Sequence, residues 1–286
     1  MTEPAAADGA LAARLAGHRV LLCYGLFGEV LAGLRPIGMD YMAGQLAWLR
    51  RIGIAAAPVA LPTAAPVAEN AVRLAGAILA EPSPVVLVAH SKGGLEALSA
   101  LLLPGVAPRC RGLLALQSPF HGSPVADAAL GFGPLKELAH HALRAARLGD
   151  GQGLADLTCA VREPWMVAHE AEIEALAALV PIASLATALG EAPDWRERAY
   201  LPLVRWMEVR GAGPNDGLVP AASTQLPGAR HAVFPGGHRA LIAAAPGRDP
   251  VGLLRAELAR LLKVQPGAQA TPSPPPPARV PHPPSP

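Results

Sequence analysis

The sequence predicts an α/β fold in which a mainly parallel central sheet carries helices on both faces. Short apolar runs of strand length alternate along the chain with longer segments of helical spacing. The runs are continuously apolar, as in parallel strands that are buried on both faces. With 286 residues, about half of them apolar, the chain is long enough to bury one sizeable core.

The first half of the chain supplies four expected strands. Each apolar run ends near Gly, Pro or another turn residue, and the intervening segments repeat apolar residues at helical spacing. The expected strands are 18–25, 53–59, 84–89 and 111–117, and the expected helices are 40–51, 64–81 and the segment after Ser91.

The pattern changes after Ser118. Residues from about 124 to 200 are mostly helix-like, including 135–148 and 164–179, which predicts an inserted helical cap. Strand signals return at 204–209 and 231–234, and a closing helix is expected at 250–263.

The predicted boundaries are a single domain over 1–265, with the cap at about 124–200, and a tail over 266–286. Ten of the last 21 residues are proline, so the tail cannot build a core and is expected to be extended or disordered. It is expected to be passive, with a weak partner that binds polyproline as the alternative.

Charge and composition exclude several classes of partner. There are 24 basic and 22 acidic residues, and this near balance of charge argues against nucleic acid or an anionic membrane as a partner. The few aromatic residues also argue against a surface that stacks on bases. The N-terminus lacks a secretory pattern, and the longest uncharged segment is interrupted by Pro181, so no transmembrane segment is expected. Three cysteines without metal-ligand spacing fit reduced thiols in a cytoplasmic protein.

The most informative motif is Ala-His-Ser-Lys-Gly-Gly at 89–94. It lies between an expected strand and an expected helix, as a small-x-Ser-x-Gly nucleophile elbow does. Small residues two positions before and after Ser91 allow the strand and helix to approach around a strained turn. The alternative is an ordinary strand–helix junction with an incidental serine.

A serine nucleophile needs a histidine base and a carboxylate that orients it. Asp216, in a loop after the expected strand 204–209, and His238, in a loop after 231–234, follow Ser91 in the order serine, acid, histidine. The rivals are Asp194 and Asp156 for the acid and His231 for the base, each at a less suitable place.

Two backbone N–H groups are candidates for an oxyanion hole. Lys92 follows the serine directly, and Leu26 lies in the glycine-containing loop after the first expected strand. His90 is expected to pack beneath the elbow without a catalytic role.

These residues resemble bacterial lipases and esterases of the α/β-hydrolase fold, especially the Pseudomonas-type triacylglycerol lipases. The motifs cover most of residues 18–243. The shared segments are Tyr-Gly-Leu-Phe-Gly at 24–28, the elbow at 89–94, Ser-Pro-Phe-His-Gly-Ser at 118–123, Asn-Asp-Gly-Leu-Val-Pro at 215–220, and His238.

The resemblance implies a serine hydrolase that cleaves small-molecule or lipid carboxylic esters through Ser91, His238 and Asp216, with Leu26 and Lys92 as oxyanion donors. Ala240 stands where secreted relatives hold a calcium-binding aspartate, so neither calcium nor a cofactor is expected. Polyester depolymerisation or acyl transfer at the same site, and a non-catalytic binding protein of this fold, are the alternatives.

Overall fold

In the computed structural model, six parallel strands form one sheet in the order β2-β1-β3-β4-β5-β6. The structure describes residues 3–26, 42–62, 64–131, 152–191 and 193–263. The strands are β1 (Arg19–Cys23), β2 (Ala55–Pro58), β3 (Val85–His90), β4 (Cys110–Leu116), β5 (Ile182–Ala188) and β6 (Arg230–Pro235). The predicted parallel α/β architecture is confirmed.

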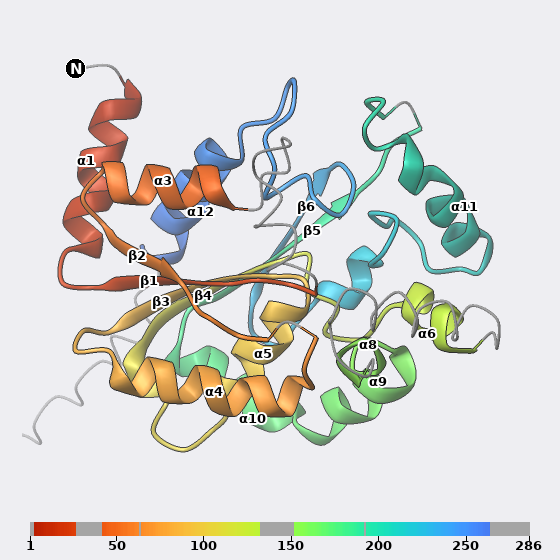
Figure 1. Cartoon of the computed structure of the whole chain (residues 1–286), viewed down its shortest axis with the longest axis horizontal. Coiled ribbons are helices and arrows are strands. Elements are labelled where there is room, and N and C mark those ends of the chain that lie inside the picture. Colours follow the sequence, from red (N-terminus) through yellow and green to blue (C-terminus); the bar gives the residue numbers. More distant parts are fainter. Residues whose placement is uncertain (1–2, 27–41, 63, 132–151, 192, 264–286) are drawn as a thin grey trace, which may run out of the picture.

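Helices cover both faces of this sheet (Figure 1). One face carries α1 (Glu3–Leu15), α3 (Ala43–Arg51) and α12 (Pro250–Leu261), and the other carries α4 (Val67–Ala80), α5 (Lys92–Leu101) and α10 (Glu170–Leu179). The remaining helices are α6 (Pro124–Gly131), α8 (Gln152–Ala155), α9 (Cys159–Ala168) and α11 (Leu201–Val209), with short 3-10 turns at Ala107–Arg109, Arg198–Tyr200 and Ala221–Thr224.

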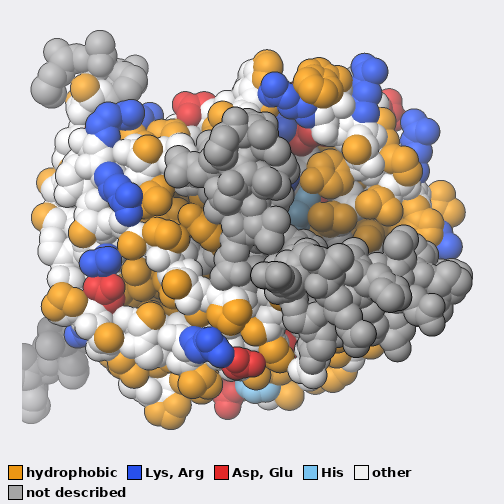
Figure 2. Space-filling view, in the orientation of Figure 1, with side chains coloured by type: hydrophobic (Ala, Val, Ile, Leu, Met, Phe, Trp, Pro, Cys, Tyr) orange, Lys and Arg blue, Asp and Glu red, His pale blue; other side chains and the backbone are white. Residues whose placement is uncertain are grey.

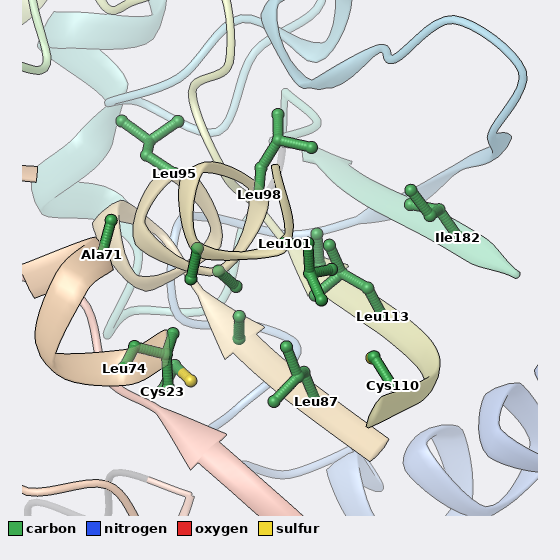
Figure 3. Packing of buried hydrophobic residues seen from close by; sticks show 14 of the residues in the cluster. Cys23, Ala71, Leu74, Leu87, Leu95, Leu98, Leu101, Cys110, Leu113 and Ile182 are labelled. Atoms are coloured by element: carbon green, nitrogen blue, oxygen red, sulfur yellow. The ribbon is translucent and has the colours of Figure 1, made fainter. Parts of the chain in front are cut away.

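Two apolar cores result from the alternation of side chains along the central strands. In β3, Leu87 faces the core beneath α4 and α5, whereas its neighbours Val86 and Val88 face the core beneath α1, α3 and α12. Figure 3 shows Leu101 of α5 lying beside Leu113 of β4 in the core that also contains Leu87. Since both faces of these strands are buried, their sequence is continuously apolar rather than alternating.

The N-terminal helix α1 was not predicted. Leu11 and Leu15, four residues apart, are buried on one side of it. On the same side, one turn before Leu11, the Asp8 carboxylate accepts hydrogen bonds from Trp48 Nε1 at 3.1 Å and Arg255 Nε at 2.6 Å. Asp8 thereby links α1 to α3 and α12.

The predicted strands at 18–25, 53–59, 84–89, 111–117 and 231–234 all form, as do the helices expected at 64–81, after Ser91 and at 250–263. The described part of the expected helix 40–51 is α3. The expected helix 135–148 and the tail 266–286 lie outside the described residues. No helix in the described ranges is long and apolar enough to cross a membrane.

The strand expected at 204–209 is wrong, because these residues form the end of α11. Val204 and Met207, three residues apart, are the buried side chains, whereas Val209 is 85% exposed. Pro202 stands in the first turn, where its fixed φ favours a helix. The apolar residues of this segment therefore repeat with a helical period. Over only six residues, that pattern cannot be told apart from the pattern of a strand.

The strand that takes its place is β5, within the range 124–200 that was expected to be helical. Ile182 to Ala188 is an almost wholly buried run and pairs with β4 and β6. Such a run cannot be told from a buried helix by periodicity alone, but Pro181 marks where α10 cannot continue. The expected helix 164–179 is also divided, into α9 and α10, at His169.

The elbow helix α5 approaches the end of β1 at Gly93. A Cβ atom at this position would lie 2.5 Å from the carbonyl oxygen of Cys23 and 2.7 Å from that of Tyr24. Both neighbours are backbone atoms of the central sheet, so they cannot move aside cheaply. Glycine is therefore required where α5 begins.

We predict that Gly93→Ala lowers the free energy of unfolding by about 1–3 kcal/mol, because the methyl group is forced against the backbone. The matched control is Gly76→Ala in α4, where a Cβ meets nothing within 4 Å. That variant is expected to gain about 0.5–1 kcal/mol from helix propensity. Urea denaturation of both variants measures the difference, and an unchanged Gly93→Ala protein would contradict the packing.

Candidate active site

Ser91 occupies a sharp turn between β3 and α5. Its backbone has φ 54° and ψ −127°, a conformation that L-residues other than glycine rarely adopt and that costs of order 1–3 kcal/mol. The turn is fixed because Ser91 N–H donates to Leu116 O of β4 at 2.9 Å, and Gly94 N–H donates to Ser91 O at 3.0 Å. The strand–turn–helix expected around the motif is present.

The structure brings Ser91, His238 and Asp216 together. His238 Nε2 lies 3.1 Å from Ser91 Oγ, and His238 Nδ1 lies 2.8 Å from Asp216 Oδ2. All three residues are buried, with 8%, 6% and 1% of their surface exposed, respectively. The two hydrogen bonds place the imidazole directly between hydroxyl and carboxylate.

The hydrogen bonds around Asp216 assign the proton on His238. Asp216 Oδ1 accepts from the backbone N–H of Leu218 at 2.9 Å and of Val219 at 2.7 Å, as an ionised carboxylate does. Asp216 Oδ2 can then only accept, so His238 Nδ1–H donates to it. His238 Nε2 is left with its lone pair facing the Ser91 hydroxyl, as a general base requires.

The long segment between β5 and β6, which we call the β5–β6 excursion, brings Asp216 to the sheet. The excursion leaves β5 at Ala188 and closes at its base, where Leu189 N–H donates to Asn215 O at 2.8 Å. Asp216, the next residue, therefore lies at the end of β5 rather than after a strand ending at Val209. The loop carrying Asp216 stays where the sequence predicted it, although the element before it is a helix.

The backbone of the His238 loop is held at successive peptide groups. Gly237 N–H donates to Glu197 Oε1 at 2.6 Å, and His238 N–H donates to Asp216 O at 3.1 Å. Gln117 Nε2–H donates to Gly237 O at 2.9 Å, and His90 Nε2–H donates to His238 O at 3.0 Å. These bonds hold the His238 loop in one arrangement.

Sequence reasoning missed two of these supporting residues, Glu197 and Gln117, and gave His90 only a packing role. Glu197 lies about 40 positions before His238, is buried, and also pairs with Arg248. Gln117 directly follows β4 with φ 52°, and it also donates to Thr187 and, at 3.4 Å, to Asp216. A glutamine closing an apolar strand was the one signal available, because its side chain must find partners inside the fold.

His90 packs beneath the elbow, as expected, and also contacts the base. Its ring centroid lies 5.0 Å from that of His238, tilted by 52°. Burial and the neighbouring His238 lower the pKa of His90 well below its usual range. His90 is therefore neutral. A neutral ring can still donate to the His238 carbonyl, and it avoids a buried positive charge beside the second imidazole.

Lys92 is fully buried, which is unusual for an ammonium group. Its Nζ forms an ion pair with Glu96 one turn later on α5, and Asn70 Nδ2–H of α4 donates to the same carboxylate oxygen at 2.7 Å. Burial raises the pKa of Glu96. This network connects the first turn of α5 to α4.

Leu26 and Lys92 remain the predicted oxyanion donors. Leu26 lines the same cavity as Ser91, and the Gly93 contact brings the end of β1 against the first turn of α5. The backbone of Lys92 stands at a helix N-terminus, where unpaired N–H groups favour negative charge.

A cavity of about 310 Å³ opens above Ser91. Its walls are largely apolar and come from the β1 loop, α6, the segment around α8, and the Asp216 loop. The lining side chains include Leu26, Pro119, Val125, Ala126, Ala129, Leu154, Leu157, Tyr200, Leu218, Val219 and Arg239. A chain of carbon atoms attached to a carbonyl at Ser91 would be shielded from water there.

The rival residues have other partners. Asp156 Oδ2 accepts from Val67 N–H at 2.5 Å at the start of α4, and Asp194 Oδ1 accepts from Arg196 N–H at 2.6 Å. His231 lies at the beginning of β6 and bonds to Thr224 Oγ1 at 2.9 Å. None of these hydrogen bonds joins the Ser91 cluster.

Cys23, Cys110 and Cys159 are free thiols. Burial is the main cause that raises the pKa of Cys110 and of Cys159 to about 12. The ranges that the structure describes contain no cluster of three or more His, Cys, Asp or Glu side chains able to hold a metal ion.

No protein-family model and no curated protein sequence matches this chain. Solved structures do match its fold. A metagenomic carboxyl esterase is 23% identical, with a TM-score of 0.65 over 87% of this chain and 76% of that one. The mature lipase BlEst2 of Bacillus licheniformis is 20% identical, with a TM-score of 0.63 over 85% and 91%.

Lipase 1 of Pelosinus fermentans has a TM-score of 0.57 at 12% identity, over 87% of this chain and 99% of that one. With its parallel sheet and surrounding helices, the chain therefore has the α/β-hydrolase fold, as the elbow predicted. The neighbours are bacterial esterases and lipases, and the narrower resemblance to the Pseudomonas type stays a prediction.

The lowered pKa of His90 makes stability depend on pH. An unfolded chain takes up a proton on this imidazole below about pH 6.5, whereas the folded chain does not. The contribution of His90 to the free energy of unfolding should be complete above that pH. As the pH drops further, the free energy of unfolding should decrease by up to about 1.4 kcal/mol per pH unit.

We predict that His90→Gln, which keeps a donor for His238 O, loses this component of the slope. The variant retains His121 and His231, whose pKa values are also lowered by burial, so the difference from the wild type isolates His90. Urea denaturation between about pH 7 and pH 5 measures it. Parallel stability curves for the two proteins would contradict the assignment.

Proposed function

We propose that this chain is a serine hydrolase that cleaves carboxylic esters. The observation that carries the proposal is the pair of hydrogen bonds from Ser91 Oγ through His238 to Asp216, at 3.1 and 2.8 Å. This is the arrangement that turns a weak hydroxyl nucleophile into one that attacks a carbonyl carbon.

In the proposed reaction, Ser91 Oγ attacks the ester carbon while His238 Nε2 takes its proton. The N–H groups of Leu26 and Lys92 stabilise the oxygen of the tetrahedral intermediate, each contributing roughly 3 kcal/mol. His238 then protonates the departing alcohol, and an acyl group remains on Ser91. A water molecule, deprotonated by His238, attacks that group and releases the acid.

Several features of the site support this reaction. Asp216 is buried and accepts two backbone N–H bonds, which hold its carboxylate where it can stabilise the imidazolium as it forms. The apolar cavity beside Ser91 suits an acyl chain. The esterases and lipases of the same fold agree with this chemistry.

Acyl transfer to an alcohol other than water would use the same acyl-enzyme, and the products formed with an added alcohol distinguish it from hydrolysis. Cytoplasmic location and the absence of a calcium requirement stay predictions from the sequence. So does a passive proline-rich tail, with a weak polyproline-binding partner as the alternative.

Replacing the triad tests the proposal. Ser91→Ala should abolish both hydrolysis of a short p-nitrophenyl ester and labelling by a fluorophosphonate, while circular dichroism shows a folded protein. Asp216→Asn should lower kcat by about 10³–10⁴-fold, because the amide favours the wrong imidazole tautomer.

Matched controls come from the rival residues. Asp194→Asn and His231→Gln should keep wild-type turnover, since neither side chain bonds to the Ser91 cluster. Labelling that persists in Ser91→Ala would reveal another nucleophile, and an active Asp216→Asn enzyme would place the acid elsewhere.

Cavity size predicts the preferred acyl chain. A cavity of about 310 Å³ is at the small end of ligand pockets, which are roughly 300–1,000 Å³. Each buried methylene contributes about 0.8 kcal/mol until the cavity is full. We expect kcat/KM to rise along a series of p-nitrophenyl esters through short and medium chains, and to stop rising for long ones.

Ala129→Leu, in α6 at the cavity wall, should move the optimum to shorter chains, whereas Ala77→Leu on α4 should not. An optimum that stays fixed in Ala129→Leu would show that the acyl chain lies outside this cavity.

A further inference from the structure

The excursion between β5 and β6 carries an exposed surface that the proposed reaction does not use. It consists of two apolar side chains and four arginines around the 3-10 turn Arg198–Tyr200 and α11. We define the α11 patch as Trp195, Arg196, Arg198, Arg205, Val209 and Arg210.

The apolar members of the α11 patch are far more exposed than a folded chain normally leaves them. Trp195 is 71% exposed and Val209 is 85% exposed. On α11 the buried side chains are Val204 and Met207, so the opposite side of the helix presents Arg205 and Val209 to solvent. The outward face of α11 is therefore exposed to solvent and carries both apolar and charged side chains.

The four arginines of the α11 patch are not paired with carboxylates of the described residues, in contrast to other arginines of the protein. Elsewhere, Arg19, Arg73 and Arg255 each pair with a carboxylate. By contrast, no arginine of the α11 patch forms a salt bridge with any carboxylate that the structure describes.

The acidic groups in this segment do not neutralise the arginines. Asp194 uses one carboxylate oxygen to accept Arg196 N–H, and Glu197 is buried and paired with Arg248. Glu208 is exposed and is the third carboxylate between residues 193 and 210. The exposed surface of the segment is therefore net positive.

Arginine and tryptophan are also combined in contact. The Arg196 guanidinium lies 5.2 Å from the ring of Trp195, and that of Arg210 lies 4.3 Å from the ring of Trp206. Figure 2 shows Lys and Arg side chains interleaved with hydrophobic ones over the part of the molecule where Figure 1 places α11. Indole rings with cationic neighbours suit the boundary between lipid headgroups and acyl chains.

The α11 patch adjoins the mouth of the active-site cavity. Tyr200, between Arg198 and Arg205 in the chain, lines the cavity together with Ser91. It packs so closely on Gly217 and Gly237 that a Cβ at either position would lie within 3 Å of its side chain. A surface bound to the α11 patch would thus lie close to the cavity that contains Ser91.

We propose that the α11 patch docks on a bilayer surface rich in anionic phospholipid, with Trp195 and Val209 entering the headgroup region and the four arginines facing lipid phosphates. Delivery of ester substrate from that surface rests on the proposed esterase activity, but docking itself does not. Each basic residue at an anionic surface strengthens binding by roughly fivefold, and the effect weakens with salt.

The test measures co-sedimentation of the full chain with vesicles of phosphatidylcholine, with and without about one third phosphatidylglycerol, at roughly 0.1 M salt. Ser91→Ala is used as the background so that no lipid is consumed. Binding is expected only with the anionic vesicles. Equal binding to both vesicle types, or binding to neither, overturns the proposal.

Charge reversal then locates the contact. Arg205→Glu with Arg210→Glu should lower the partition coefficient at least about tenfold. The matched control is Arg51→Glu with Arg111→Glu, which makes the same change of charge at exposed positions on α3 and β4, and it should stay within about twofold. An equal loss in the control overturns the proposal, because it shows attraction without a specific face.

Two further variants keep the test falsifiable if the charge reversals disturb α11. Arg196→Gln with Arg198→Gln lies outside that helix and should also weaken binding, and Trp195→Ala with Val209→Ser should do so without changing charge. Full binding of both variants to the anionic vesicles overturns the proposal. It is also overturned if the protein binds an acidic protein through the α11 patch but binds no vesicle.

Hydrolysis of a soluble short ester separates this inference from the proposed function. Arg205→Glu with Arg210→Glu, made with Ser91 intact, should keep wild-type kcat on that ester while losing vesicle binding. A chain that binds vesicles but hydrolyses no ester would remove the enzymatic proposal and leave the docking surface standing.

Discussion

The contact between Gly93 and the carbonyls that end β1 is the constraint on which the candidate site depends. It brings the first turn of α5 against the sheet, and the chain can reach that position only through the left-handed backbone of Ser91. The same contact that tightens the fold also presents the serine hydroxyl at the edge of the sheet. The packing that stabilises the fold therefore also sets the geometry of Ser91. Tight packing on both sides of this residue holds it in its strained conformation.

The base is held in a different way. His238 belongs to a loop whose position depends on hydrogen bonds rather than on regular structure. Gln117 and His90 donate to the loop, and Glu197 and Asp216 accept from it. These partners come from four separate segments of the chain, all buried. Because a buried polar group that loses its partner is costly, the loop has one favoured arrangement. A preorganised imidazole needs no reordering when a substrate binds.

The sequence was sufficient for those features that depend on local pattern. Continuous apolar strands and the elbow motif are local signals, and Ser91, Asp216 and His238 lie together where strand ends meet. The order of elements between 180 and 210 was not predictable in this way, because β5 and α11 each carry a run whose period fits both helix and strand. Only the pairing of Ile182–Ala188 with β4 and β6 decides between them.

The support around His238 was equally hidden from the sequence. Nothing near Glu197 indicates that its carboxylate turns inward to meet Gly237, since it stands among charged residues that are exposed. Contacts of this kind arise from tertiary structure and leave no periodic trace. Asp8, which joins α1 to α3 and α12, is a second example.

The closure of the β5–β6 excursion by Leu189 and Asn215 has an evolutionary consequence. Everything between these two residues is a module that begins and ends at one point, so its length and surface can diverge while the sheet beneath stays unchanged. Glu197 and Tyr200 are exceptions inside the module, since Glu197 bonds to the His238 loop and Tyr200 packs on it. Natural variation should therefore be restrained at these two residues and on the buried side of α11, and grafting such an excursion between homologues would succeed only if both residues travel with it.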